Sequence, residues 1–454
     1  MSTNDLEIEV LSDDEKRENR RQRRMKSQRI AYVSLVVFFV MLAVIVVGGI
    51  FVVNKEVGVV NQQYTSEEQV EEIETLEQEN AESVVESASE EENIVETDVK
   101  EQEDAKVLDE VVEAIISEMT LEEKVAGLFV VTPEGITGVD VAVQAGDGTK
   151  AALEKYPVGG FIYFKKNIES EEQIKKMVEN TVSYNKYPMF IAVDEEGGVV
   201  TRLASGLQIE NVGPMADIGA TGDNTKAYEA MNKVGTYLTE YGFNVNFAPV
   251  ADVLTNPKNV SIGDRSFGSD ANLVAGMVAS AMNGLEESGV TACIKHFPGL
   301  GDASDDTHNG LSVIDKSLEE LKQTELVPFI SAIENGAHMI MVGHMSLPQI
   351  IGDNTPATMS KEVISDLLRS ELGFNGVIIT DAMNMGAITE YYSADEAAIR
   401  AFKAGADMVL MPEDFKLAYE GVIEAVKDGT ISEERINNSL KRVFRIKYAD
   451  SVGE

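Results

Sequence analysis

The segment KHFPGLGDASDDTH, residues 295–308, is the stretch around which the rest of the chain is organised. It follows a short apolar run, Gly289–Ile294, that predicts a buried strand. Loops on rigid scaffolds are where catalytic groups concentrate, so this loop is a candidate functional site. A carboxylate at Asp306 can fix the tautomer of His308 two residues away and raise its basicity. A polar loop whose Asp residues make Asx turns is the alternative.

Eight apolar runs rich in β-branched residues alternate with amphipathic helical stretches from residue 107 onward. The runs are Val125–Val131, Val158–Phe164, Met189–Val193, Phe243–Val250, Val290–Ile294, His338–Gly343, Gly376–Thr380 and Asp407–Met411. Continuous apolar strands separated by helices indicate a parallel sheet covered on both faces. Eight such units over roughly 340 residues predict an α/β fold of the (β/α)8 TIM-barrel type. A doubly wound open sheet is the alternative, but no GxGxxG motif or P-loop follows the first run.

Polar residues follow five consecutive runs. They are Asp194, Glu195, Glu196 and Arg202 after the third run, Asp252 and Arg265 after the fourth, Lys295, His296, Asp306 and His308 at the fifth, His344 after the sixth and Asp381 after the seventh. The active sites of such barrels lie at the C-terminal ends of the strands. One charged residue at a strand end is often only solvated, but five strands in succession predict an active site at this rim.

Asp381 ends an apolar run in the segment IITDAMNM, residues 378–385. A carboxylate at such a strand end, ahead of apolar side chains, can act as a nucleophile. The alternative interpretation for an isolated Asp is a helix N-cap.

The segment 295–308 resembles the signature of bacterial β-N-acetylglucosaminidases in glycoside hydrolase family 3, which is usually KHFPGHG followed by D-[ST]-H. Leu300 stands where the family commonly has a second His, and Thr307 stands where Ser is common. Three more segments are similar to family motifs: VDEEGGVVTR (193–202), NPKNVSIGDRSFG (256–268) and TDAMNM (380–385). The resemblance covers residues 108–448. It implies a single-domain barrel of the N-acetylglucosaminidase branch rather than a two-domain β-glucosidase.

The resemblance also implies roles for individual residues. Asp381 would attack the anomeric carbon and form a covalent glycosyl-enzyme intermediate, so configuration would be retained. His308, held by Asp306, would replace the usual second carboxylic acid as acid and base, and an imidazole pKa near about 6.5 suits both tasks. The implied sugar-binding residues are Asp194, Arg202, Arg265, Lys295 and His296. No cofactor is expected.

Composition narrows the function classes. The chain has 454 residues, of which 78 are acidic and 38 basic, so its net charge of −40 argues against a nucleic-acid partner. Cys293 is the single cysteine, which excludes an intramolecular disulfide. A metal-dependent hydrolase on the same fold is a further hypothesis. Such barrels usually present His-x-His on the first strand, whereas the earliest histidine here is His296.

Residues 1–106 differ in composition from the rest of the chain. Residues 1–29 are polar and end in a basic cluster, and Ile30–Val53 contains no charged residue. This run is long enough to span a bilayer, and the basic cluster predicts a cytoplasmic N-terminus with the catalytic domain, residues 107–454, outside the cell. A cleaved signal peptide is the alternative, although its apolar region is usually only ~7–15 residues. The acidic segment 54–106 predicts a disordered linker, with a lone acidic helix as the alternative.

The predicted function is a membrane-anchored, exo-acting retaining β-N-acetylglucosaminidase. Its expected substrate is a β-linked glycan with N-acetylglucosamine at the non-reducing end, such as a peptidoglycan fragment or muropeptide. A family 3 β-glucosidase and an N-acetylglucosaminide phosphorylase are alternatives within the same chemistry. An alternative of another class is a non-catalytic anchor that binds cell-wall glycan.

Overall fold

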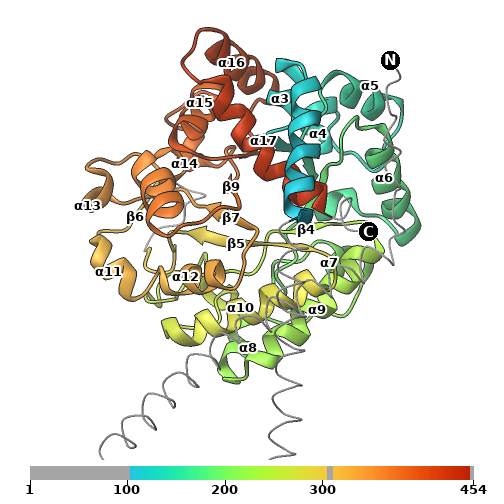
Figure 1. Cartoon of the computed structure of the whole chain (residues 1–454). Coiled ribbons are helices and arrows are strands. Elements are labelled where there is room, and N and C mark those ends of the chain that lie inside the picture. The colour runs from blue at the N-terminus through green and yellow to red at the C-terminus, as the bar shows by residue number, and fades with distance from the viewer. Residues whose placement is uncertain (1–102, 304–309, 450–454) are drawn as a thin grey trace, which may run out of the picture. The chain divides into compact units, whose positions relative to one another are not determined.

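A computed structural model describes residues 103–303 and 310–449 of the chain. Within these ranges one compact unit extends over Asp109–Ala449 (Figure 1). The predicted segments 1–29 and 30–53 and the linker up to residue 102 lie outside the described residues, and so do Asp306 and His308. No helix within the two described ranges has the length and apolar character needed to cross a membrane.

The compact unit is built on one sheet of eight parallel strands. They are β1 (Phe129–Val131), β2 (Gly160–Ile162), β3 (Phe190–Val193), β4 (Val245–Asn246), β5 (Thr291–Phe297), β7 (Met339–Val342), β9 (Val377–Thr380) and β10 (Val409–Leu410). Their order is β10-β1-β2-β3-β4-β5-β7-β9, and every pairing is parallel. The two ends of this order meet at a parallel bridge between Ile379 and Met408, so the sheet is a nearly closed barrel. Each of the eight predicted runs contains one strand, or most of one.

Helices connect the strands and cover the outside of the barrel (Figure 1). The longer ones are α5 (Asp147–Lys155), α6 (Glu171–Tyr184), α9 (Asn224–Glu240), α10 (Ala271–Glu287), α12 (Val327–Glu334), η4 (Glu362–Glu371), α15 (Ala394–Ala404), α16 (Phe415–Lys427) and α17 (Glu433–Lys447). Strand and helix layers pack through aromatic contacts: Phe129 of β1 meets Phe402 of α15 and Phe415 of α16 edge to face, with ring centroids 5.8 and 5.5 Å apart. The core therefore lies between the sheet and its helices.

Several runs are shorter as strands than predicted, and in two of them the reason is local. In the first, α3 (Leu121–Ala126) occupies the beginning, because the Thr120 hydroxyl and the Glu123 carboxylate form a capping box that starts a helix there. In the fourth, the strand stops at Asn246, ahead of Pro249, which has no N–H to give to a neighbouring strand. Pairing resumes only as a single bridge between Val250 and Lys295.

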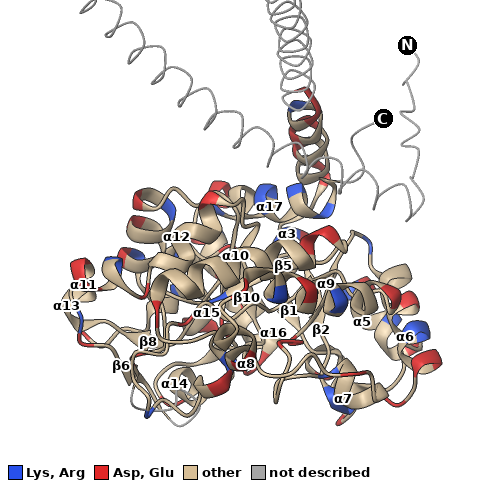
Figure 2. Cartoon of the chain, turned by 90° about the horizontal axis from the view of Figure 1, so that it is seen from below, with Lys and Arg blue, Asp and Glu red and all other residues tan. Residues whose placement is uncertain are grey.

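Short elements inserted after the strands build up the C-terminal rim of the barrel. They are α7 (Leu203–Leu207) and α8 (Met215–Ala220) after β3, η2 (Gly263–Arg265) after β4, β6 (Ser312–Val313) after β5, β8 (Met345–Ser346), α13 (Pro348–Ile351) and η3 (Ala357–Met359) after β7, and α14 (Gly386–Thr389) after β9. Strand β6 pairs with β8 in a separate two-stranded sheet. Figure 2 shows α7, α14, β6 and β8 along the same side of the domain.

A buried charge cluster stabilises the opposite end of the barrel. Asp407 precedes β10 and is fully buried, and its carboxylate accepts hydrogen bonds from the Ile378 N–H at 3.0 Å and from Arg369 at 2.6 Å. Arg442 and Arg435 reach its other oxygen at 3.0 and 3.6 Å. The three guanidinium groups compensate the cost of burying this one carboxylate.

Candidate active site

The loop after β3 is shaped by a buried glutamate. The Glu195 carboxylate accepts hydrogen bonds from the backbone N–H groups of Arg202, Leu203 and Ala204 at 2.6, 2.8 and 3.0 Å. It also accepts one from the hydroxyl of Tyr237 on α9 at 2.9 Å. These bonds satisfy the N–H groups at the start of α7, which have no partner within the helix. Glu195 thereby fixes the two ends of the loop that carries its neighbours Asp194 and Glu196.

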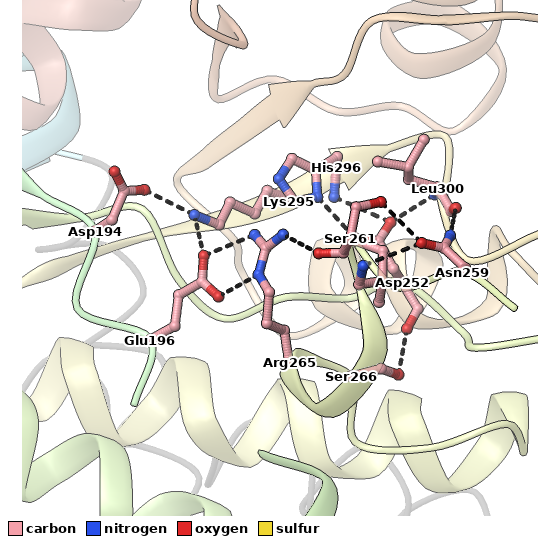
Figure 3. A network of polar contacts seen from close by, with 11 residues as sticks. Asp194, Glu196, Asp252, Asn259, Ser261, Arg265, Ser266, Lys295, His296 and Leu300 are labelled. Carbon is pink, nitrogen blue, oxygen red and sulfur yellow. Dashed lines mark hydrogen bonds and ion pairs between the residues drawn. The ribbon is translucent and has the colours of Figure 1, made fainter. Parts of the chain in front are cut away.

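Five charged side chains from three successive strand ends form one network, of which Figure 3 shows Asp194, Glu196, Arg265 and Lys295. The Lys295 ammonium lies 2.8 Å from Oδ1 of Asp194 and 2.6 Å from Oε1 of Glu196. The Arg265 guanidinium pairs with both oxygens of Glu196, at 2.8 and 2.9 Å. Arg202 lies 3.6 Å from Oδ2 of Asp194, which is a looser contact. The predicted sugar-binding residues Asp194, Arg202, Arg265 and Lys295 are therefore neighbours.

The electrostatics of the network keep its members charged. Burial raises the pKa of Glu196, but the charges of Lys295 and Arg265 outweigh burial and lower this pKa far below its usual value. Burial lowers the pKa of Lys295, and the carboxylates of Asp194 and Glu196 more than reverse this effect. Fixed charged donors and acceptors of this kind make strong hydrogen bonds to hydroxyl groups.

His296 is oriented by a buried carboxylate. Its Nδ1 atom lies 2.7 Å from Oδ2 of Asp252, and both side chains are buried (Figure 3). Oδ1 of Asp252 accepts hydrogen bonds from the backbone N–H groups of Leu300 at 2.6 Å and of His296 at 3.3 Å. With Nδ1 donating to Asp252, Nε2 is the ring nitrogen that can address a ligand.

Leu300, which stands where the family commonly has a second His, holds the loop after β5 in place through its backbone groups. Its N–H bonds to Asp252 and its carbonyl accepts from the Asn259 side chain at 2.7 Å, while its own side chain is buried. The next residue, Gly301, packs so tightly that a Cβ atom there would lie 1.8 Å from the carbonyl oxygen of Val253. Only glycine fits this close approach of two backbones.

The chain entering residues 304–309 is held by the loop after β4. The Thr255 hydroxyl donates to Asp302 at 3.0 Å, and the Asn256 amide donates to the Asp302 carbonyl at 3.2 Å. Lys316, which follows the segment in sequence, lies 3.4 Å from Asp302. The predicted dyad of Asp306 and His308 belongs to the segment between these anchors and lies outside the described residues.

Asp381 lies at the end of β9, as predicted. Its N–H donates to the Val342 carbonyl at 2.8 Å, and its Oδ1 accepts from the Ala382 N–H at 2.7 Å. His344 supports this position, because its Nε2 lies 2.9 Å from the Ala382 carbonyl and its Nδ1 lies 2.9 Å from the Thr358 hydroxyl. Asp381 is therefore held through its backbone, with its side chain partly exposed.

The surroundings of Asp381 favour its ionised form. Burial raises the pKa of this carboxyl group, but the positive charges that His296 and His344 carry when protonated, the Ala382 N–H and the Lys295 ammonium outweigh burial and lower it. A carboxylate that stays ionised at neutral pH can attack an electrophilic carbon.

Two contributors to this site had no role assigned from sequence. Glu196 and Asp252 stand out in sequence as acidic residues at strand ends, yet nothing there indicates that Glu196 holds both Lys295 and Arg265, or that Asp252 orients His296. Their burial, 2% and 0% exposed, distinguishes them from solvated rim charges. Within residues 103–303 and 310–449, no three His, Cys, Asp or Glu side chains are grouped so that they could hold a metal ion.

The fold and the rim together define a class of protein: a parallel barrel whose C-terminal strand ends present carboxylates, ammonium and guanidinium groups to a polar ligand. Residues 120–446 match the model of the glycosyl hydrolase family 3 N-terminal domain, which is 327 of 454 residues (446 − 120 + 1). The chain belongs to glycosyl hydrolase family 3.

Similar proteins bear related names. Beta-hexosaminidase A from Pseudoalteromonas piscicida is 33% identical over 326 residues, covering 65% of this chain and 54% of that protein. Beta-hexosaminidase LpqI from Mycobacterium tuberculosis is 31% identical, covering 68% of this chain and 80% of LpqI. A β-N-acetylglucosaminidase structure from Paenibacillus sp. str. FPU-7 is 37% identical with a TM-score of 0.68, covering 74% of this chain and 64% of that one. The chain thus spans about half of the first protein and somewhat under two thirds of the third.

Proposed function

We propose that the chain is an exo-acting, retaining β-N-acetylhexosaminidase that releases N-acetylglucosamine from the non-reducing end of β-linked glycans. The observation that carries this proposal is the placement of Asp381. Asp381 directly follows β9, and although burial raises the pKa of its carboxyl group, the charges of His296 and His344 when protonated, the Ala382 N–H and the Lys295 ammonium lower this pKa overall. The names of the relatives, beta-hexosaminidase and β-N-acetylglucosaminidase, support the choice of sugar.

In the proposed first step, a carboxylate oxygen of Asp381 forms a bond to the anomeric carbon. The bond from that carbon to the glycosidic oxygen breaks. The leaving oxygen keeps the electron pair of the broken bond and accepts a proton from His308. In the second step, water attacks the anomeric carbon and gives a proton to His308, and the bond to Asp381 breaks. Two displacements retain the configuration. Asp306 would hold His308 through both steps.

The charged network would bind the sugar in this proposal. Asp194 would accept hydrogen bonds from ring hydroxyls, and Arg202, whose contact with Asp194 is loose, would donate to them. Lys295 and His296 would donate to further hydroxyls, while Arg265 holds Glu196 and so the Lys295 ammonium in place. A network already in position pays little ordering entropy when the sugar arrives.

The test compares an aryl β-N-acetylglucosaminide with an aryl β-glucoside, using the full chain and Asp381→Ala. Activity on the N-acetylglucosaminide alone, lost in the variant, is expected. Activity on the glucoside alone would overturn the choice of sugar. Product released as sugar phosphate, only when phosphate is added, would replace hydrolysis by phosphorolysis. Silence on both aryl glycosides with and without phosphate, from a folded protein, would favour the glycan-binding anchor.

We further propose that peptidoglycan fragments are the natural substrate and that Ile30–Val53 anchors the chain with its catalytic domain outside the cell. The support is the uncharged run, which follows a basic cluster. The test is fractionation of cells expressing the full chain and a chain lacking residues 1–53. Only the full chain should remain with membranes after a high-salt wash, and protease added to spheroplasts should digest its catalytic domain. For the substrate, purified muropeptides should release free N-acetylglucosamine.

A further inference from the structure

A cavity of about 450 Å³ opens among the rim loops that follow β5, β7 and β9. Leu311 and Val313 line it from the β5 side, Asp353 and Asn354 from the loop after β8, and Tyr391 and Tyr392 from the segment after α14. The strands ahead of these three loops lead into His296, His344 and Asp381, respectively. The cavity therefore opens on the same face of the barrel as the candidate active site, but it uses none of the residues of the charged network.

A continuous set of contacts leads from Asp381 to this cavity. The carbonyl oxygen of Ala382, the residue after Asp381, lies 2.9 Å from Nε2 of His344. Strand β8 begins at Met345, directly after His344, and its Ser346 forms a bridge to Pro356 in the cavity wall. Ser346 also pairs with Val313 of β6. The floor of the cavity is thus part of the structure that supports the candidate nucleophile.

The lining combines an exposed aromatic ring with polar groups. Tyr391 is 61% exposed and Val313 is 47% exposed, so both keep much of their apolar surface open to a ligand. Asp353 and Asn354 lie in an exposed turn that the Thr355 N–H fixes by donating to Asp353 at 2.8 Å. The Arg400 guanidinium lies 5.1 Å from the Tyr392 ring centre and so covers part of that ring. Tyr391 is the aromatic side chain best placed to meet a ligand.

This chemistry matches a sugar ring. A pyranose has an apolar face of C–H bonds, which packs on an aromatic ring, and hydroxyl groups around its edge, which donate hydrogen bonds to carboxylate and amide oxygens. A cavity of this volume is within the range of small-ligand sites. The Asp353 carboxylate also repels other carboxylates, and hydrogen bonds from Thr355 keep its pKa below the usual value. The fitting ring therefore carries no free carboxylate, as in a sugar with only hydroxyl and acetamido groups or in a muramic acid whose carboxyl group is amide-linked to a peptide.

We propose that the cavity lined by Tyr391, Asp353 and Asn354 binds a neutral sugar ring on the leaving-group side of the scissile bond. This inference rests on the proposed function, because the charged network of the β3, β4 and β5 loops would hold the terminal sugar. The next sugars of the glycan would then extend across Asp381 toward the loops after β7 and β9. Longer neutral glycans would gain binding energy that a short aryl leaving group does not.

The experiment measures kcat/KM of the full chain on an aryl β-N-acetylglucosaminide and on chito-oligosaccharides of two to four sugars. Tyr391→Ala should lose about tenfold in kcat/KM on the tetrasaccharide, since an aromatic contact of this kind contributes about 1.4 kcal/mol, which is a factor of ten. Its loss on the aryl glycoside should be at least fivefold smaller. Tyr391→Phe should keep the wild-type dependence on chain length, because the ring remains. Leu417→Ala, an exposed apolar residue on α16, is the matched control.

Two results would overturn the proposal. The first is a dependence of kcat/KM on chain length that is the same in Tyr391→Ala and in the wild type, so that the variant loses equally on the aryl glycoside and on the tetrasaccharide. The second is an equal wild-type kcat/KM on chitobiose and on a disaccharide whose reducing-end muramic acid has a free carboxyl group, which would contradict a preference for a neutral ring. If the wild type cleaves no N-acetylglucosaminide, the proposed function fails instead. The cavity is then tested by calorimetry with chitotetraose, and equal affinity of wild type and Tyr391→Ala would overturn it.

Discussion

Nδ1 of His296 lies 2.7 Å from Oδ2 of Asp252, and Asp252 is completely buried. The same carboxylate binds the N–H of Leu300, so one side chain fixes both an imidazole ring and the first turn of the loop that follows it. The orientation of the His296 ring therefore depends on a residue that would itself not contact substrate.

Asp252→Asn should lower kcat/KM on the order of a hundredfold with little loss of folded protein. The amide can still accept from Leu300, but its NH2 group would face Nδ1 of His296 and favour the wrong tautomer. Steady-state kinetics on the aryl N-acetylglucosaminide, with circular dichroism for folding, measure this effect. In a His296→Ala background, the same substitution should cost much less, because it acts through His296. An undiminished cost in that background would contradict a positioning role.

Asp381→Gly should abolish turnover and respond to added azide. The small anion can occupy the space of the missing carboxylate and attack the anomeric carbon from the same side, while the leaving group is protonated as before. The product should be the α-glycosyl azide, identified by NMR spectroscopy. Glycosyl azide of β configuration, or no rescue in a protein that still binds N-acetylglucosamine, would contradict the assignment of Asp381 as nucleophile.

Glu196→Gln should destabilise the fold by about 3 kcal/mol at pH 7, because Lys295 and Arg265 lose their shared buried counter-charge. The pKa of Glu196 is lower in the folded chain than its ordinary value of 4.5. Its contribution is therefore fully present above about pH 4.5 and is lost as the pH falls toward the folded pKa. Urea unfolding at pH 7, 5, 4 and 3 should show a difference between wild type and variant that shrinks with acid. Glu210→Gln, on the surface, is the control and should behave like the wild type.

Asp407→Asn should destabilise the barrel by about 3–5 kcal/mol, since three arginines would surround an uncharged side chain at the N-terminal end of β10. The site at the other end should keep its kcat and KM at 25 °C, where the variant is still folded. Thermal unfolding and steady-state kinetics on the same preparation measure both quantities. A loss of kcat in a fully folded variant would show that this cluster acts on the site as well as on stability.

Much of the fold was predictable because burial on both faces leaves a strong signal. Strands such as Phe190–Val193 and Val377–Thr380 are fully buried and read as unbroken apolar runs. Parallel strands also place their C-terminal ends on one rim, so the sequence alone assigns Asp194, Lys295 and Asp381 to one face of the barrel. The positions of these residues are confirmed, whereas their roles stay predictions.

The pairings within the site were not predictable from sequence. Which carboxylate holds Lys295, and whether Asp252 or another acid meets His296, depends on strand register and loop geometry. The partners lie far apart in the sequence, by 101 residues for Asp194 and Lys295 and by 44 for Asp252 and His296. The exact ends of the strands were also not predictable from the sequence. The helix over Leu121–Ala126 shortened the first apolar run through a side-chain cap, a local contact that competes with the apolar pattern.

Lys295 pairs with both Asp194 and Glu196, which limits the substitutions that this site can accept during evolution. Replacing Lys295 alone would remove the cation that Asp194 and Glu196 share, and replacing Glu196 alone would leave Arg265 without its carboxylate partner. Each single step is costly, while a compensated pair of steps is not. The proposed glycan specificity should therefore change first in the loops around Tyr391, where side chains are exposed and largely independent, and only later among the interlocked charges at the barrel rim.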